Sequence, residues 1–276
     1  MDLSSKKNIQ NLLEKHKTRP SKGFGQNFLI DKDVLKKIIQ AAEISPKEVV
    51  LEIGPGVGNL TQELAKKAKK VIAIEKDPKM VEILKENLKN FNNIEAIQGD
   101  ILKIENRELK IRNYKIVANL PYYIVSPVTR KFLDSEFSPR EMILMVQKEV
   151  AQRICAKPPD MSLLAVSVQL YAKPEIIFYV PKESFWPQPK VDSAVIKLKV
   201  KNEGMKINKN LFFKIAKAGF SQPRKQILNN LSKELKSDKE EVRFWLLKNN
   251  VQPSRRAETL KVEDWLELTE NIKLNK

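Results

Sequence analysis

Residues 49–61 read VVLEIGPGVGNLT. The five residues before the first glycine predict a buried strand, and the three glycines predict a tight turn into a helix, where the backbone approaches a ligand closely. Dinucleotide-binding folds carry a similar loop, but the spacing here is Gly-x-Gly-x-Gly instead of Gly-x-Gly-x-x-Gly. The carboxylate of Glu52, just before the loop, would repel a pyrophosphate and attract an ammonium group. The stretch therefore predicts an α/β fold with a ligand site at Glu52, Gly54, Gly56 and Gly58.

The sequence around this stretch alternates between short β-branched runs and helical periods. This alternation predicts a parallel sheet with right-handed crossovers, and the continuous apolar runs indicate strands covered by helices on both faces. The last two runs, joined by a proline-rich stretch, predict a final hairpin on the sheet. The seven expected strands are 49–53, 71–75, 94–98, 115–119, 142–147, 175–180 and 193–200. The helices expected among them are 60–68, 78–90, 126–134, 148–155 and 163–172.

No strand signal remains after Gly204. The rest of the chain predicts helices over 209–219, 223–235, 239–248 and 262–271. We therefore expect a Rossmann-like domain over residues 1–202, with a seven-stranded, mostly parallel sheet. A small all-α domain is expected over residues 203–276.

The composition is strongly basic, with a formal charge of +17 from 51 Lys and Arg against 34 Asp and Glu. Such an excess suits a polyanionic partner, and nucleic acid is the first candidate. The alternative is that the lysines merely solvate the surface. An anionic membrane is the competing partner, but no basic amphipathic helix has the aromatic face that lies on lipid.

Cysteine and histidine occur once each, as Cys155 and His16. These counts exclude an internal disulfide, a Cys/His zinc cluster and a catalytic triad built on both, so we expect no metal. No stretch approaches the ~20 apolar residues that span a bilayer, and the N-terminus lacks the apolar run of a secretory signal. We therefore expect a cytoplasmic protein with no membrane partner.

Two further acids stand at the ends of the next expected strands. Glu75 lies a little over 20 residues after Gly54, where an acid in such folds accepts hydrogen bonds from both ribose hydroxyls. Asp100 follows the third strand and is placed to accept from an adenine amine. Any one of these acids alone could instead belong to the start of a helix, since Asp77 before Pro78 and Asp100 before Ile101 both stand at positions typical of a helix N-cap. Together with Glu52, they predict a nucleoside site.

The fourth strand ends in Asn119-Leu120-Pro121-Tyr122-Tyr123, which resembles the Asn/Asp-Pro-Pro-Tyr loop of amino-methyltransferases. The exocyclic amine of adenine is a poor nucleophile because its lone pair is delocalised into the ring. Acceptance of both amine hydrogens, by the Asn119 side-chain oxygen and the Leu120 carbonyl, would favour the tetrahedral nitrogen that attacks a methyl group. Pro121 fixes φ, and the Tyr122 ring offers a stacking surface for a flipped base. The alternative is a simple Pro-Tyr turn after a strand.

With these pieces assembled, the chain is similar to the small-subunit (16S) rRNA adenine dimethyltransferase family over nearly its whole length. The resemblance rests on the segments GQNFL (25–29), LEIGPGVG (51–58), Glu75, Gly99-Asp100, NLPYY (119–123), QKEVAQR (147–153) and FWPQPKVDS (185–193). It implies a class I methyltransferase domain that binds S-adenosylmethionine. It also implies that two adjacent adenosines in a terminal hairpin loop are methylated, with up to four methyl transfers per ribosome, within a small subunit or assembly intermediate.

The resemblance also implies which residues contact the cofactor. Gln26, Asn27 and Leu29 would contact it from the N-terminal segment, and Gly54, Glu75, Asp100 and Asn119 would complete its contacts. Two positions depart from the family pattern. Pro223 replaces an arginine in a basic run, which weakens the expectation of one RNA contact, and Tyr123 stands where bacterial members often carry asparagine.

The expected RNA surface is concentrated in the helical domain. Eight basic residues lie between Lys206 and Lys236, against one acid, Glu234. Phosphate contacts are therefore expected there. The residues that we expect to bind RNA are Lys22, Arg224, Lys225, Arg255 and Arg256.

Two other functions are compatible with the sequence. A large-subunit rRNA adenine methyltransferase of the antibiotic-resistance type would share the cofactor motifs, although the long match after Val180 favours the small-subunit type. A non-catalytic assembly or transcription factor would use only the basic surface, which the intact set of Glu52, Glu75, Asp100 and Asn119 argues against. We expect a monomer.

Overall fold

The computed structural model describes residues 2–201 and 207–272, which form two compact units. The sheet unit holds the described residues up to Ala151 together with Lys173–Val200, and the helical unit holds Gln152–Ala172 together with the described residues from Lys201 onward. The expected boundary between residues 202 and 203 lies outside the described residues. The division into domains 1–202 and 203–276 stays a prediction. None of the described helices is long and apolar enough to cross a membrane.

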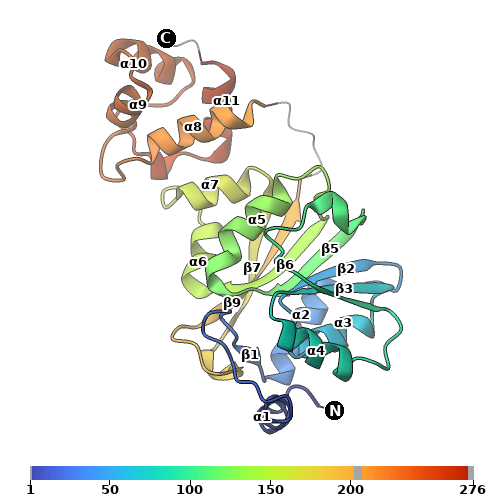
Figure 1. Cartoon of the computed structure of the whole chain (residues 1–276). Coiled ribbons are helices and arrows are strands. Elements are labelled where there is room, and N and C mark those ends of the chain that lie inside the picture. Colours follow the sequence, from blue (N-terminus) through green and yellow to red (C-terminus); the bar gives the residue numbers. More distant parts are fainter. Residues whose placement is uncertain (1, 202–206, 273–276) are drawn as a thin grey trace. The chain divides into compact units, whose positions relative to one another are not determined.

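The described part of the sheet unit contains a seven-stranded sheet in the order β4-β3-β2-β5-β6-β9-β7 (Figure 1). The first five strands in this order, β4, β3, β2, β5 and β6, pair in parallel. Strand β9 pairs antiparallel with β6, with Ser193 opposite Gln147. The mostly parallel sheet predicted from the sequence is confirmed. The strands are β2 (Val49–Ile53), β3 (Lys70–Glu75), β4 (Ile94–Gln98), β5 (Tyr114–Asn119), β6 (Glu141–Gln147), β7 (Ala172–Val180) and β9 (Ser193–Val200).

The edge strands differ from the central ones in burial. Strands β2, β3, β5 and β6 are buried at almost every residue, as expected for strands covered on both faces. Strand β4, at one end of the order, is only half-buried, and β7, at the other end, alternates between exposed and covered residues. Pro174 lies within β7, a position that an edge strand tolerates because one row of its amides has no partner strand.

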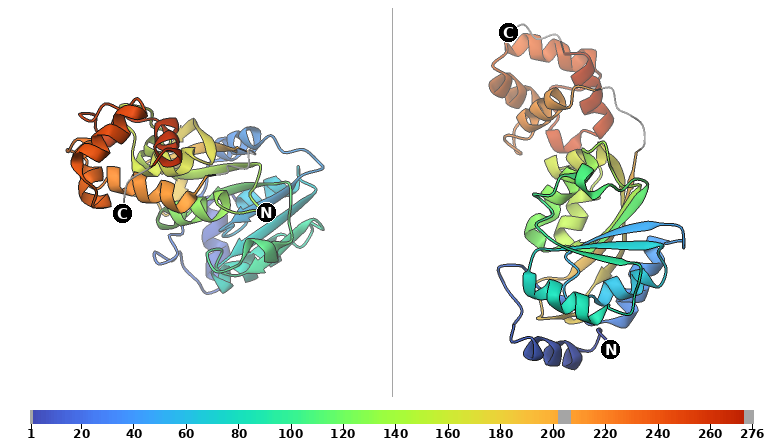
Figure 2. Two further views of the ribbon diagram at one scale, coloured as in Figure 1. Left: turned by 90° about the horizontal axis from the view of Figure 1, so that it is seen from above. Right: turned by 45° about the vertical axis from the view of Figure 1, so that its right-hand side comes forward.

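Helices pack on the sheet through residues at helical spacing. The valines Val50, Val71, Val117 and Val195 form one buried cluster with residues of α2 and α3. Helix α1 adds Ile9, Leu12 and Leu13 to a second cluster with Met80 and Ile83 of α4; Figure 2 shows α1 in dark blue. The helices of this unit are α1 (Lys6–Lys15), α2 (Lys32–Ala42), α3 (Asn59–Ala65), α4 (Pro78–Asn87) and α5 (Val125–Leu133); α6 (Lys148–Ile154) leads out of it.

The helical unit is built around a buried tryptophan. Trp265 is fully buried, and its ring lies so close to Gly219 that a Cβ at that position would overlap with Cη2. Helix α9 begins at Ile227 and not at 223 as expected. In a helix that started at 223 the Ile227 amide would donate to the carbonyl four residues earlier, but here it donates to the Arg255 carbonyl. The helices of this unit are α7 (Leu163–Gln169), α8 (Lys209–Gly219), α9 (Ile227–Leu235), α10 (Lys239–Lys248) and α11 (Val262–Glu270).

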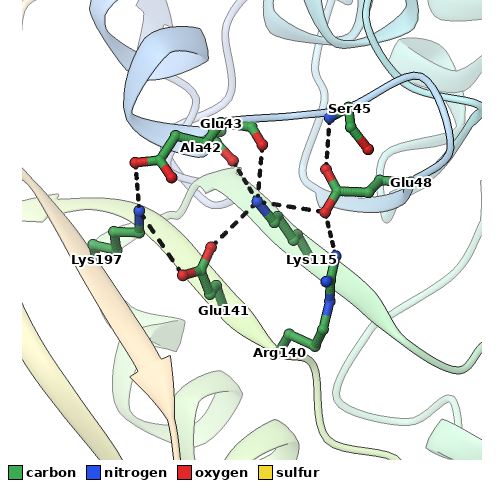
Figure 3. Close-up of polar contacts among 8 residues, drawn as sticks. All are labelled: Ala42, Glu43, Ser45, Glu48, Lys115, Arg140, Glu141 and Lys197. Carbon is green, nitrogen blue, oxygen red and sulfur yellow. Dashed lines mark hydrogen bonds and ion pairs between the residues drawn. The ribbon is translucent and has the colours of Figure 1, made fainter.

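A buried lysine holds the amino-terminal end of β5 against the end of α2 (Figure 3). The Lys115 ammonium donates to the carbonyls of Ala42 and Glu43 at 2.9 and 3.0 Å. It also lies 3.3 Å from a Glu141 carboxylate oxygen and 3.5 Å from one of Glu48. Since Lys115 is the second residue of the strand that Asn119 ends, this ion cluster secures the sheet at the end opposite the loop of residues 119–123.

Candidate active site

A cavity lies at the carboxyl ends of β2, β3 and β5, where parallel α/β sheets bind ligands. Glu52 lies near the end of β2, Glu75 ends β3 and Asn119 ends β5. The structure brings most of the predicted residues to this one cavity. Its lining includes Gln26, Asn27, Leu29, Glu52, Gly54, Gly56, Glu75, Asn119, Leu120, Pro121 and Tyr122.

Two predicted cofactor residues lie elsewhere. Asp100 lines a second cavity, which shares Gly54, Glu75 and Pro121 with the first and is therefore its neighbour. Gly58 is absent from the lining of both. Its φ is +93°, and a Cβ there would lie 2.8 Å from Cδ1 of Leu84. Gly58 thus serves the turn and the packing of α4 in this structure.

Glu52 is the most deeply buried acid at the cavity. Its side chain is 2% exposed, and within residues 2–201 and 207–272 its Oε2 has no hydrogen-bond partner. Burial raises the pKa of its carboxyl to about 8, and the nearby Glu75 adds to the shift. A buried carboxylate oxygen without a partner is costly. The site therefore fits a ligand that brings a cation to Glu52.

Glu75 organises the glycine loop. Its Oε2 accepts from the Gly56 amide at 3.1 Å, and its Oε1 accepts from the Asp77 amide at 2.9 Å. Burial raises the pKa of this carboxyl, although both amide hydrogen bonds oppose the shift. A carboxylate offers about four lone-pair sites, so acceptor capacity remains for a hydroxyl donor of a ligand.

The loop of residues 119–123 is fixed from both sides. The Asn119 Nδ2 donates to the Asn27 carbonyl at 3.1 Å, and the Leu120 amide donates to Met145 at 3.3 Å. The Tyr122 hydroxyl lies 3.0 Å from Ser193 Oγ at the start of β9, and burial raises the pKa of this hydroxyl. The loop therefore has little freedom to rotate its functional groups.

Comparison with known proteins identifies the family. The family described as ribosomal RNA adenine dimethylase matches residues 16–274. This chain belongs to that family. A ribosomal RNA small subunit methyltransferase A of Dehalococcoides mccartyi is 45% identical over 258 residues, which cover 92% of this chain and 89% of that protein. The resemblance inferred from the sequence motifs is confirmed.

Two solved structures share the fold of this dimethylase. A dimethyladenosine transferase from Plasmodium falciparum has a TM-score of 0.73 at 30% identity, covering 86% of this chain and 94% of that one. The 23S rRNA methyltransferase ErmE has a TM-score of 0.72 at 28% identity, covering 88% of this chain and 98% of that one. The Rossmann-like methyltransferase fold is thereby confirmed.

One supporting element of the site was not predicted. Strand β1 (Phe28–Leu29) pairs antiparallel with β8 (Phe185–Trp186), and the Phe28 and Trp186 rings stack with centroids 6.4 Å apart. This pairing holds the N-terminal segment over the cavity of the dimethylase. Strands of two residues carry no periodicity, so the only signal was the apolar character of both segments.

The N-terminal segment is also anchored by Gln26. Its Nε2 donates to Asp77 Oδ2 at 2.8 Å, and its Oε1 accepts from the Ser21 amide at 2.8 Å. Asp77 also caps α4 through the Lys79 amide, as its position before Pro78 suggested. Gln26 therefore fixes the segment from within the cavity wall.

The predicted RNA-binding residues differ in how free their cations are. Lys22 is exposed in the sheet unit, and Arg224 and Lys225 are exposed in the turn before α9. Arg255 is only 34% exposed; its Nε donates to Thr259 Oγ1 at 3.0 Å and its guanidinium lies 3.9 Å from Asp264. Arg256 lies 3.6 Å from Glu258. Arg255 therefore has a structural role within its own unit.

Proposed function

We propose that this chain uses S-adenosylmethionine to dimethylate the N6 amines of two adjacent adenosines in the 3′-terminal hairpin loop of small-subunit rRNA. The reaction would contribute to small-subunit biogenesis. The observation that carries the proposal is one cavity that joins the fixed amide of Asn119 with the unpartnered carboxylate oxygen of Glu52. The 45% identity to a small subunit methyltransferase A supports the small-subunit substrate, whereas the two fold neighbours have almost equal TM-scores.

The cavity residues fit the cofactor by their chemistry. When bound, S-adenosylmethionine supplies an electrophilic methyl carbon on a sulfonium sulfur, which keeps the electron pair of the broken C–S bond. Glu52 binds the ammonium group of the cofactor. Glu75 accepts hydrogen bonds from the ribose hydroxyls with the lone pairs that the Gly56 and Asp77 amides leave open. Gly54 and Gly56 have positive φ values, which let the loop backbone pass close to the ligand.

Asn119 and Leu120 act on the adenine amine. The donation of Nδ2 to Asn27 leaves Asn119 Oδ1 as the acceptor, and no donor reaches Oδ1 within the described residues. This oxygen and the Leu120 carbonyl accept the two amine hydrogens and concentrate the lone pair on nitrogen. The nitrogen forms the N–C bond and a proton then leaves to solvent. Pro121, at φ −53°, and the ring of Tyr122 shape the pocket for the base.

The RNA partner is bound by cations of both units. The proposed contacts are those of Lys22, Arg224, Lys225, Arg255 and Arg256 with phosphates, within a small subunit or an assembly intermediate. Residues 203–276 would serve as an RNA-binding helical domain. We further propose that the protein acts in the cytoplasm as a monomer.

The test is incubation with radiolabelled S-adenosylmethionine and separately purified, undermethylated small and large ribosomal subunits, followed by mapping of the label. Label on paired loop adenosines of small-subunit RNA is the expected result. Label on large-subunit RNA would assign the chain to the resistance type instead. No transfer despite tight cofactor binding would favour a non-catalytic assembly factor and overturn the proposal.

A further inference from the structure

Tyr123 is an exposed aromatic residue at the rim of the second cavity. It is 58% exposed and lines this cavity together with Asp100 and Leu102. Leu102 is also exposed, at 37%, so two of the seven large exposed hydrophobic residues of the described chain lie at one cavity. Single exposed apolar residues are ordinary, but two on the rim of one cavity mark a surface that a ligand covers.

The Tyr123 ring lies beside the N-terminal segment. Gly25 has a φ of +63°, and a Cβ there would lie 3.5 Å from Tyr123 Cε1 and 3.1 Å from Pro121 Cβ. The ring therefore lies beside Gly25, at a distance that an added Cβ would bridge with an ordinary van der Waals contact. Its neighbour Tyr122 is used differently, since the Tyr122 hydroxyl is bonded to Ser193 and its ring lines the first cavity.

The polar groups of the second cavity suit a flat ring that carries an amine. Ile53, Ile74 and Ile101 give it apolar walls, and Asp100 is its acceptor. Asp100 Oδ1 accepts from the Leu102 amide at 3.0 Å, and Oδ2 lies 3.0 Å from the Lys76 ammonium. Burial alone would raise the pKa of the Asp100 carboxyl, but Lys76 and the Leu102 amide lower it below its usual value. Asp100 is therefore ionised and keeps lone pairs for an amine donor.

We propose that Tyr123 forms an aromatic wall for the adenine ring of the cofactor, opposite the apolar side chains of the second cavity, and that Lys76 positions Asp100 for the adenine amine. The position that departs from the family pattern is then a cofactor contact and not a platform for the target base. The inference rests on the proposed function, because it requires an adenosine-bearing cofactor. The two cavities share Gly54, Glu75 and Pro121, so one ligand reaches from Glu52 in the first to Asp100 in the second.

The test is calorimetric binding of S-adenosylhomocysteine to the full chain, with three variants. Tyr123→Ala is expected to raise the Kd about tenfold, the usual loss when a base–aromatic stack is removed. Tyr123→Phe keeps the ring and should stay within about twofold of wild type. Tyr179→Ala, which removes another half-exposed tyrosine of the sheet unit, is the matched control and should not change the Kd.

A second measurement separates cofactor contact from RNA contact. The KM for undermethylated small subunits should be unchanged in Tyr123→Ala when the cofactor is saturating. An unchanged Kd for S-adenosylhomocysteine, with a raised KM for the subunit, would overturn the inference and assign Tyr123 to the RNA. Failure of wild type to bind S-adenosylhomocysteine would overturn the proposed function, and this inference with it. Wild-type binding and methylation with no change in Tyr123→Ala would overturn the inference alone.

Discussion

The side chain of Asn119 donates a hydrogen bond to the main-chain carbonyl of Asn27, at 3.1 Å and across 92 residues of sequence. This bond ties the end of β5 to the N-terminal segment that forms one wall of the cavity. It also fixes the amide, because an amide whose nitrogen donates to a carbonyl must present its oxygen elsewhere. The N-terminal segment and the loop at Asn119 are therefore positioned relative to each other by one side chain.

Replacement of Asn119 by alanine tests the acceptor role. We expect Asn119→Ala to lower the rate of methyl transfer by about 100-fold or more, as when one transition-state hydrogen-bonding group is removed. Cofactor affinity should stay within about tenfold of wild type, since Glu52 and Glu75 remain. Asn119→Asp keeps an acceptor but loses the hydrogen bond to Asn27, so its rate should lie between those of wild type and Asn119→Ala. Single-turnover rates and calorimetry measure both quantities, and near-normal turnover in Asn119→Ala would refute the role.

The raised pKa of the Glu52 carboxyl predicts that cofactor binding releases a proton. Its raised pKa of about 8 means that the free protein holds a proton there near neutral pH, which pairing with an ammonium group expels. Calorimetry of S-adenosylhomocysteine binding near pH 6.5, in buffers of different ionisation enthalpy, should show release of about one proton. Release should vanish above pH 8 and in Glu52→Gln. Binding that is independent of the buffer near pH 6.5 would rule out the pairing.

The same pKa has a consequence for stability. An acid whose pKa is raised by folding favours the native state only while it is protonated, so the free energy of unfolding falls as pH rises from 4.5 towards 8. Glu52→Gln removes this loss. The variant should therefore gain stability over wild type in urea unfolding above pH 8, with little difference near pH 4.5.

Much of the sheet and site was predictable because the signals are local. Strand 49–53, the acids Glu52 and Glu75 and the loop at Asn119 have types and spacings that parallel-sheet geometry places at one edge, and they line one cavity. The helices expected at 209–219 and 239–248 have the bounds that periodicity gave. These predictions required no knowledge of contacts between distant segments.

What was missed depends on such distant contacts. The β1–β8 pair joins Phe28 to Trp186, and neither two-residue strand has a period of its own. The assignment of Gly58 to the cofactor stays a prediction, but its packing against Leu84, where a Cβ would lie 2.8 Å from Cδ1, could not be foreseen. The cluster around Lys115 was also invisible, because a lysine in an apolar run has no sequence mark that shows which carboxylates surround it.

The ion cluster around Lys115 should contribute to the stability of the fold and not to cofactor binding. Lys115→Met should lower the free energy of unfolding by about 1–3 kcal/mol, because it removes the cation shared by the partly buried Glu48 and Glu141, which keep only Arg140 and Lys197 as partners. Lys199→Met, at an exposed position of β9, is the control and should change it by less than about 0.5 kcal/mol. Urea unfolding measures both. Affinity for S-adenosylhomocysteine should be unchanged in the folded variant, since Lys115 lies at the opposite end of β5 from Asn119.

The exposed cations in the turn before α9 should determine part of the salt dependence of RNA binding. Arg224 and Lys225 are exposed, and no ion pair joins either of them to an acid in the part of the chain that the structure describes. Removal of one phosphate-binding cation should reduce the slope of log K against log salt by about 0.7–0.9, so Arg224→Ala with Lys225→Ala should flatten it by about 1.5. The control is Lys67→Ala with Lys69→Ala, which removes equal charge just beyond α3, where cations complement the helix dipole.

The comparison of the two double variants separates specific contacts from net charge. If only the total charge of +17 attracts the RNA, both pairs should weaken binding and flatten the slope equally. If the turn contacts phosphates, only the Arg224 and Lys225 pair should flatten it. Arg255→Ala gives a third result, because its guanidinium is bonded to Thr259 and lies near Asp264. It should lower the stability of the helical unit and, if Arg255 contacts a phosphate as proposed, also flatten the salt slope; an unchanged slope would remove Arg255 from the RNA contacts.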